Sequence, residues 1–379
     1  MSIEFQIPAD LLPDDGRFGS GPSKVRVGQT DEISRRNTPN GRHLIVGTSH
    51  RQAPVKDVVA DIRAMIIELF AAPDGYEVAL GNGGSTAFWA IAATSLIQHR
   101  SAHAAFGEFG QKFVDEAARA PHLEAPVLFS AEAGQLATVQ PTDGVDAYAW
   151  PQHETSTGVL SPVKRITTDA LMLVDATSIA GGIEVDIAQT DAYYFAPQKC
   201  FGSDGGLWLA FLSPAAQERA RELHEATDRW MPQILDLSIA LTNSVKNQTL
   251  NTPALMTLLS LRNQLRWMLD IGGLEACAAR SRASTDAIYQ WAENREFAMP
   301  FVANPTYRSP VVATIDFEGV DASRIASILR DNGIVDVEPY RKLGRNQLRI
   351  AAFPAVETSD VEKLLTSIDW VVDALRSVV

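Results

Sequence analysis

Apolar residues along this chain follow two patterns, one typical of helices and the other typical of buried strands. Val58, Ile62, Ile66 and Leu69 recur every three or four residues, which predicts a helix from residue 55 to residue 70. Short apolar runs predict strands instead. The predicted strands cover residues 77–80, 147–150, 171–175, 192–195 and 207–212. Strands that alternate with helices are typical of an α/β fold, and the strand that ends at residue 175 reads as a central parallel strand.

The helical pattern continues through the middle of the chain and breaks at Gly272-Gly273. Helical spacing is present at residues 85–96, 111–118, 214–236 and 254–269, and again from the break to about residue 294. Beyond that point the order is strand, helix, strand, helix, at residues 311–317, 322–332, 348–353 and 359–378. We therefore expect a Pro- and Gly-rich arm (1–40) that packs on the body or on a neighbour, a large domain (41–272) and a smaller α+β domain (273–379).

Composition narrows the class of protein. The 379 residues are 46% hydrophobic and 21% charged, as in a globular protein with a large core. The net charge of -13 offers no basic surface for binding nucleic acid. The chain contains no run of about 18 apolar residues, so the sequence predicts no membrane-spanning helix. Two cysteines cannot build a disulfide framework, and the initial residues lack a signal-peptide pattern, so we expect a cytoplasmic protein. We expect no metal, because metal-ligand spacing of His or Cys is absent.

One lysine stands out by its surroundings. Lys199 lies in a short loop between two β-type runs, with Phe195, Pro197, Cys200 and Phe201 close by in the sequence. Poor solvation lowers an ammonium pKa toward the range in which the neutral amine attacks an aldehyde. The alternative is an ordinary lysine whose stem lies on the loop and whose head group reaches water.

A carboxylate at the end of a predicted strand favours the first interpretation. Residues 171–175 form an apolar run that ends in Asp175, and open α/β sheets bind ligands at the carboxyl ends of such strands. An aspartate there can pair with a pyridinium nitrogen, while a lysine holds the aldehyde of the same ring. Together, Lys199 and Asp175 predict a site for pyridoxal 5'-phosphate.

Two further stretches have features of an anion site. Gly84, Ser85 and Thr86 stand between a predicted strand and a predicted helix, where backbone N–H groups and hydroxyls can cradle a phosphate; an ordinary helix cap is the alternative. Arg349 interrupts a predicted strand and is either exposed at an edge or directed at an anion. Neither GxGxxG spacing nor a Walker lysine is present, which weighs against a nucleotide site.

The chain resembles the phosphoserine aminotransferases, within the fold type I pyridoxal-phosphate enzymes, from Phe18 to its C-terminus. The motifs that carry the resemblance are Phe18-Gly19-Ser20-Gly21-Pro22, Ser49-His50-Arg51, Gly83-Gly84-Ser85-Thr86, His153-Glu154-Thr155, Asp175, Gln198-Lys199, Asn251-Thr252-Pro253 and Leu348-Arg349. Each motif is weak alone, and the ordered set is specific. The resemblance implies a large domain with a mostly parallel seven-stranded sheet flanked by helices, and a smaller α+β C-terminal domain.

The resemblance also implies roles for the matched residues. Lys199 and Asp175 would be catalytic, and Asn251 and Thr252 would come from the partner in a homodimer with shared active sites. The implied cofactor-binding residues are Gly84, Ser85, Phe109, Thr155, Asp175, Gln198, Lys199, Asn251 and Thr252, and the implied substrate-binding residues are His50, Arg51 and Arg349. The sequence departs from the family pattern at Phe109, where Trp is frequent, at His153, where Asn is more usual, and at Ser85, where some relatives carry a basic residue.

The activity that the resemblance implies is transfer of an amino group between glutamate and 3-phosphohydroxypyruvate, giving O-phosphoserine and 2-oxoglutarate in serine biosynthesis. The sequence does not define the preferred amino donor, or whether 4-phosphohydroxythreonine of vitamin B6 biosynthesis is also a substrate. Serine or alanine:glyoxylate-type aminotransferases of the same fold are the alternative enzymes. A pyridoxal-phosphate-binding protein without turnover is the alternative from another class. A cysteine desulfurase fits less well, because it needs a mobile exposed thiol.

Overall fold

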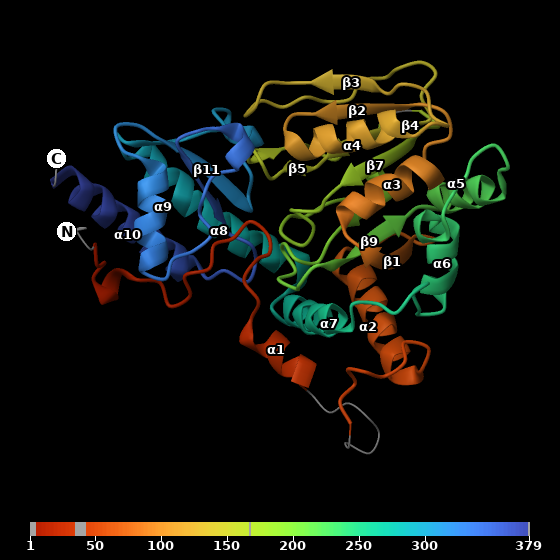
Figure 1. Ribbon diagram of the computed structural model, residues 1–379, viewed down its shortest axis with the longest axis horizontal. Helices are drawn as coiled ribbons and strands as arrows, with labels where there is room; N and C mark the ends of the chain where they lie inside the picture. Colours follow the sequence, from red (N-terminus) through yellow and green to blue (C-terminus); the bar gives the residue numbers. More distant parts are fainter. Residues whose placement is uncertain (1–4, 35–42, 167, 378–379) are drawn as a thin grey trace.

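A seven-stranded sheet lies at the centre of the structure, a computed structural model that describes residues 5–34, 43–166 and 168–377 (Figure 1). Its strand order is β1-β9-β8-β7-β4-β2-β3. The strands are β1 (Glu77–Gly83), β2 (Ser101–Ala105), β3 (Val127–Ser130), β4 (Ala147–Pro151), β7 (Leu171–Asp175), β8 (Ala192–Phe195) and β9 (Gly206–Leu212). Strands β3, β2, β4, β7 and β8 are parallel to one another, and β9 runs against both of its neighbours. The expected mostly parallel sheet is confirmed.

Side chains of the central strands alternate between the two faces of the sheet, so both faces are buried. Tyr148 and Met172 pack in a core with one layer of helices, whereas Ala149 and Leu173 pack in a core with the other. The first layer contains α2 (Ala53–Leu69) and α7 (Leu255–Asp270). The second contains α3 (Ser85–Ser95), α4 (Glu108–Arg119), α5 (Pro214–Glu225) and α6 (Leu237–Val245). Burial on both faces explains why these strands read as continuous apolar runs.

A third core surrounds a three-stranded antiparallel sheet near the C-terminus, beside the large sheet in Figure 1. Its strands are β10 (Ala298–Pro300), β11 (Val312–Phe317) and β12 (Gln347–Ala351), and its helices are α8 (Gly273–Glu293), α9 (Ala322–Asp331) and α10 (Thr358–Ser377). Gly272, with a φ of 116°, separates α7 from α8. This left-handed conformation suits glycine and explains the break in the helical pattern.

The N-terminal residues pack against the body of their own chain. In α1 (Val27–Ser34), the buried side-chain amide of Gln29 donates to Ser260 Oγ and to the Gly202 carbonyl, each at 3.0 Å. Phe18 is fully buried in the third core, and its carbonyl accepts a hydrogen bond from the Ala351 N–H at 3.0 Å. Residues 1–4 and 35–40 of the expected arm, and residue 378 of the expected last helix, lie outside the described residues.

Several elements differ from the sequence prediction. The helix predicted over 214–236 ends at Glu225, because Ala226 has an extended backbone; α6 then begins after Asp236, whose carboxylate accepts a hydrogen bond from the Ile239 N–H at 3.2 Å. Strands β2 and β3 lack the predictive pattern, since β2 is built from Ser, Ala and His and β3 has only partly buried and exposed side chains. A separate short hairpin joins β5 (His153–Glu154) and β6 (Val159–Leu160).

Candidate active site

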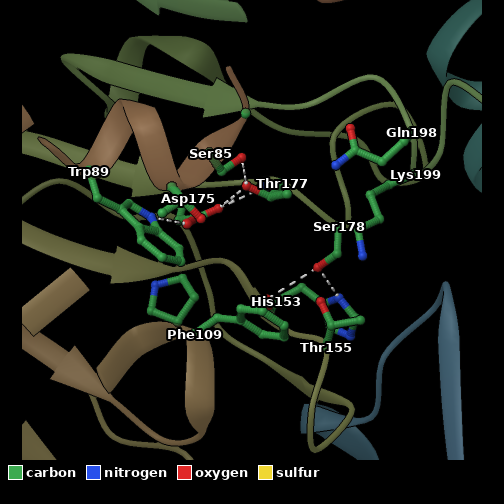
Figure 2. Close-up of a pocket in the computed structure, with 13 residues that line it drawn as sticks. Ser85, Trp89, Phe109, His153, Thr155, Asp175, Thr177, Ser178, Gln198 and Lys199 are labelled. Carbon is green, nitrogen blue, oxygen red and sulfur yellow. Dashed lines mark hydrogen bonds between the residues drawn. The ribbon is translucent and has the colours of Figure 1, made fainter. Parts of the chain in front are cut away.

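A cavity of about 200 Å³ lies at the carboxyl ends of the parallel strands, where the sequence predicts a ligand (Figure 2). Pro151 and Asp175 end β4 and β7, and Lys199 follows β8. The cavity is lined by Gly84, Ser85, Thr86, Trp89, Phe109, Pro151, His153, Thr155, Asp175, Thr177, Ser178, Gln198 and Lys199. Seven of the nine predicted cofactor-binding residues therefore line one cavity; Asn251 and Thr252 do not.

Lys199 is held inside this cavity by the N-terminal arm. Its Nζ donates to the Ser20 carbonyl at 2.6 Å, and Ser23 Oγ donates to the Lys199 carbonyl at 2.5 Å. At Gly21, whose φ is 132°, a β-carbon would come within 2.2 Å of Nζ, so the arm approaches the lysine closely only because this residue is glycine. Burial, with a contribution from the positive charge of Arg349, lowers the pKa of Lys199 from 10.5 to about 8. The alternative of a head group that reaches open water does not apply.

Asp175 is buried and surrounded by hydrogen-bond donors. Trp89 Nε1 donates to Oδ2 at 2.8 Å, and the Thr177 N–H donates to Oδ1 at 2.9 Å. The Thr177 hydroxyl also donates to Oδ1 and lies 2.5 Å from Ser85 Oγ. Burial raises the pKa of Asp175, and the bonds from Thr177 and Trp89 act against that shift because they favour the charged form.

Glu154 fixes the helix start that carries Phe109. Its Oε2 accepts from the backbone N–H groups of Phe109 and Gly110, each at 3.0 Å, and its Oε1 accepts from Ser156 Oγ at 2.6 Å. Gly107 makes this possible, since a β-carbon there would come within 2.3 Å of Glu154 Cγ. Burial raises the pKa of Glu154, while the hydrogen bonds favour the carboxylate. A carboxylate at this end of α4 satisfies N–H groups that have no partner within the helix.

His153 contributes an uncharged ring to the cavity. Its Nδ1 lies 2.8 Å from Ser178 Oγ, and its Nε2 is buried without a hydrogen-bond partner among the described residues. Burial, reinforced by the nearby charges of Lys199 and Arg349, lowers the pKa of His153 from 6.5 to about 3. The ring is therefore neutral at physiological pH and can offer Nε2 to a ligand.

Arg349 on β12 is directed at the cavity wall. Its Nη1 donates to the Thr155 carbonyl at 3.2 Å, its guanidinium lies 5.6 Å from the centre of the Tyr340 ring, and its Nε is buried without a partner among the described residues. Burial lowers the pKa of Arg349, but a guanidinium keeps its charge in proteins. Of the two alternatives left by the sequence, the contacts favour a residue that faces the site over one exposed at an edge.

Besides Arg349, four predicted ligand residues do not line the cavity: His50, Arg51, Asn251 and Thr252. We refer to these four as the loop cluster. Thr252 Oγ1 lies 3.3 Å from His50 Nδ1, and Arg51 Nη1 donates at 3.0 Å to Oε1 of Gln248, three residues before Asn251. The structure thus brings the loop cluster together, outside the lining of the cavity.

Sequence reasoning assigned no role to four site residues: Trp89, Glu154, Thr177 and Ser178. For two of them, the spacing in the sequence could have indicated the role. Trp89 follows Ser85 by four residues and so lies on the same face of α3, while Thr177 follows Asp175 by two residues, within reach of its carboxylate. Glu154 and Ser178 depend on contacts between separate loops, which no local pattern indicates.

The residues of the cavity fit pyridoxal phosphate. The cavity combines an amine of lowered pKa, a buried carboxylate, the Phe109 ring and the N-terminus of α3. His153 Nε2 and Gln198 Oε1 are buried without partners among the described residues, and a polar ligand would satisfy them. Across the described ranges, no group of three or more His, Cys, Asp or Glu is arranged to hold a metal, and no helix is long and apolar enough to cross a membrane.

Comparison with known proteins identifies the family of this chain. Residues 27–336 match the family model Aminotransferase class-V, which defines the class of enzyme. A phosphoserine aminotransferase of Nocardioides sp. is 54% identical over 380 residues, covering 99% of this chain and 100% of that protein. This chain therefore belongs to the phosphoserine aminotransferase family. The prediction of an aminotransferase is confirmed.

Solved structures share the fold. A phosphoserine aminotransferase from Cytophaga hutchinsonii has a TM-score of 0.85 at 23% identity, covering 94% of this chain and 99% of that chain. A phosphoserine aminotransferase from Trichomonas vaginalis with bound pyridoxal phosphate has a TM-score of 0.79 at 16% identity, covering 94% and 99%. The fold type I architecture is thereby confirmed.

The Glu154 carboxylate should contribute to stability through the start of α4. We expect Glu154→Gln to lower the free energy of unfolding by about 2 kcal/mol, because the amide leaves a buried backbone donor without an acceptor. Urea unfolding measures this. The matched control is Glu108→Gln in the same turn, which removes an ion pair with the exposed Lys342 and should cost much less than Glu154→Gln, because water screens an exposed pair. Equal losses in the two variants would contradict the assignment.

The depressed pKa of Lys199 should appear in the pH dependence of cofactor incorporation. Only the neutral amine attacks an aldehyde, so the rate should rise with pH and level off above about pH 8, instead of rising until 10.5. Stopped-flow absorbance of cofactor-free protein mixed with pyridoxal phosphate measures the rate. In Arg349→Gln the inflection should move to higher pH, because one charge that lowers the pKa is removed. An inflection that stays in place in this variant would count against the electrostatic explanation.

Proposed function

We propose that this enzyme transfers an amino group between glutamate and 3-phosphohydroxypyruvate, giving O-phosphoserine and 2-oxoglutarate, with pyridoxal 5'-phosphate as its cofactor. The observation that carries the proposal is the presence of the partly buried Lys199 and the buried Asp175 in one cavity of a chain that is 54% identical to a phosphoserine aminotransferase. The remaining lining residues supply what such a cofactor needs: an aromatic ring, a helix N-terminus and unpaired polar atoms.

The cofactor would be held at several points by this chain. Lys199 would bind the aldehyde carbon and Asp175 the ring nitrogen. Phe109 would pack on the ring and Thr155 would contact the ring oxygen. The residues assigned to the phosphate are Gly84, Ser85 and Gln198, at or near the N-terminus of α3, where backbone N–H groups and the helix dipole favour an anion.

The protein residues then move and hold protons. Pyridoxal phosphate, when bound, supplies an electron sink for the charge left on the substrate Cα after a proton is removed. Lys199 is the one amine among the lining residues, so we assign to it both removal of the proton from the substrate Cα and delivery of a proton to the aldehyde carbon of the cofactor, which would receive the nitrogen. Asp175, held by Trp89 and Thr177, keeps the proton on the ring nitrogen.

Two sets of basic side chains would select a phosphorylated 2-oxo acid. Arg349 has a free buried Nε beside the cavity wall and would bind the substrate carboxylate, where its planar fork matches two oxygens. His50 and Arg51 would bind the substrate phosphate. The neutral His153 adds a hydrogen-bonding group and no charge, so it does not compete with Arg349 for the carboxylate.

The position of the loop cluster supports a homodimer with shared active sites. Its four residues do not line the cavity of their own chain. The exposed side chains of Val245 and Met256, at 53% and 56%, flank the segment that carries Asn251 and Thr252, as expected for a surface that a partner covers. We further propose the division into an arm (1–40), a large domain (41–272) and a small domain (273–379), and a cytoplasmic location.

Single-turnover reactions test the substrate assignment. Glutamate should convert the bound cofactor to its amine form, and 3-phosphohydroxypyruvate should convert it back faster than the unphosphorylated oxo acids pyruvate and glyoxylate. Absorbance of the bound cofactor follows both half-reactions. A preference for an unphosphorylated oxo acid would favour a serine or alanine:glyoxylate-type enzyme, and no reaction with any amino donor would favour a binding protein.

Asp175→Asn tests the partner of the ring nitrogen. We expect the rate of the glutamate half-reaction to fall by about two to four powers of ten, because loss of a buried charge-assisted partner removes about 3 to 5 kcal/mol. Stopped-flow absorbance measures the rate. Asp191→Asn is the matched control, since Asp191 is also buried but bonds to Ser213 and the Met172 N–H, outside the cavity. A fall of less than tenfold in Asp175→Asn would show that another group holds the ring nitrogen.

Complementation tests the shared site. Thr252→Ala should weaken cofactor retention, and Lys199→Ala should be unable to complete the reaction. In a mixed dimer, one site would combine Lys199 from the first variant with Thr252 from the second and would therefore be intact. Activity after proven subunit exchange should exceed the sum of the two parents. Activity no greater than that sum, or a fully active monomer in sedimentation, would contradict the shared site.

A further inference from the structure

Three side chains form a continuous row along one wall of the cavity. Ser85 Oγ lies 2.5 Å from Thr177 Oγ1, and the Thr177 hydroxyl also bonds to Asp175 Oδ1. Figure 2 shows Thr177 between the other two residues. The row connects the N-terminus of α3 with the end of β7. Its two ends are therefore the positions that we assign to the phosphate and to the ring nitrogen of the cofactor.

The two hydroxyl protons of the row are just enough for the two contacts within it. Asp175 accepts hydrogen bonds from the Trp89 N–H and from the Thr177 backbone N–H, as expected of an ionised carboxylate. An ionised carboxylate can accept hydrogen bonds but cannot donate them. The single hydroxyl proton of Thr177 therefore points to Asp175. The short contact between the two hydroxyls is then a hydrogen bond only if Ser85 donates its own proton to Thr177. In this arrangement Ser85 has no proton left for a ligand.

An anion bound at Ser85 would reverse the direction of the hydrogen bond between Ser85 and Thr177. If Ser85 donates to the anion, its contact with Thr177 stays a hydrogen bond only when the Thr177 proton turns from Asp175 to Ser85, a direction that the geometry also allows. Asp175 then keeps its two N–H donors and loses the hydroxyl donor, which frees an acceptor site on Oδ1. A protonated ring nitrogen is a suitable third donor.

We propose that Thr177 is a positioning residue that couples anion binding at Ser85 to hydrogen bonding at Asp175. The proposal rests on the function assigned above and deepens it: the phosphate end of the ligand prepares the carboxylate that receives the nitrogen end. Coupling of this kind is reciprocal, so occupation of Asp175 by a ring N–H also strengthens anion binding at Ser85.

The two ends can be tested separately with two small probes. 4-Deoxypyridoxine has the ring nitrogen but neither aldehyde nor phosphate, so it cannot react with Lys199; inorganic phosphate occupies the other end. Fluorescence titration of the cofactor-free protein gives the dissociation constant of 4-deoxypyridoxine with and without saturating phosphate. We expect phosphate to tighten its binding by at least about fivefold in the wild type.

Matched variants isolate the Thr177 hydroxyl. Thr177→Ser keeps the hydroxyl and should keep the tightening. Thr177→Val has nearly the same shape without the hydroxyl and should reduce the tightening to less than about twofold, and Ser85→Ala should do the same. Any direct effect of the phosphate charge on the ring persists in Thr177→Val and is subtracted by the comparison.

The outcomes separate this proposal from the proposed function. Equal tightening in Thr177→Val and wild type, or none in the wild type, would overturn the coupling. If Thr177→Val fails to fold, Ser85→Ala decides, because an undiminished phosphate effect there would overturn it too. A wild-type protein that does not bind pyridoxal phosphate or react with glutamate would instead refute the function itself.

Discussion

The buried carboxylate of Asp175 is the constraint on which the site depends. Burying a charge is unfavourable unless hydrogen bonds satisfy it, so the end of β7 can carry Asp175 only with Trp89 and Thr177 in place. Trp89 belongs to α3, whose first turn also carries Ser85. The need to stabilise one carboxylate therefore fixes a helix, and that helix in turn places the anion-binding end of the cavity.

Electrostatic asymmetry follows from this arrangement. Lys199 and Arg349 approach the cavity from β8 and β12, Asp175 lies at the end of β7, and burial keeps His153 neutral. Each positive group is poorly hydrated, so an anionic ligand replaces water as its partner at little cost. Strand β12, which carries Arg349, also belongs to the third core, while Lys199 follows a strand of the large sheet. With the proposed roles of these two residues, the substrate would contact two separately packed parts of the chain.

The sequence predicted best where chemistry and local pattern coincide. Asp175 ends a continuous apolar run, and Lys199 stands alone in an apolar loop, so both could be found from their neighbours in the chain. The partners of these residues were harder, because Glu154 reaches α4 and Ser178 reaches His153 across loops distant in sequence. Strand β2 was missed for a different reason: its small and polar side chains are buried by their neighbours and not by their own hydrophobicity.

The position of the N-terminal arm has a consequence for how the protein forms during synthesis. Phe18 is paired with Ala351, and Ser20 holds the amine of Lys199, so the first residues made have partners that leave the ribosome much later. Contacts of such long sequence separation form slowly, because the chain must close large loops first. A nascent chain that stops before β12 lacks Ala351, one of the two backbone partners of Phe18. The arm that contacts Lys199 therefore completes its contacts only after β12 has been made.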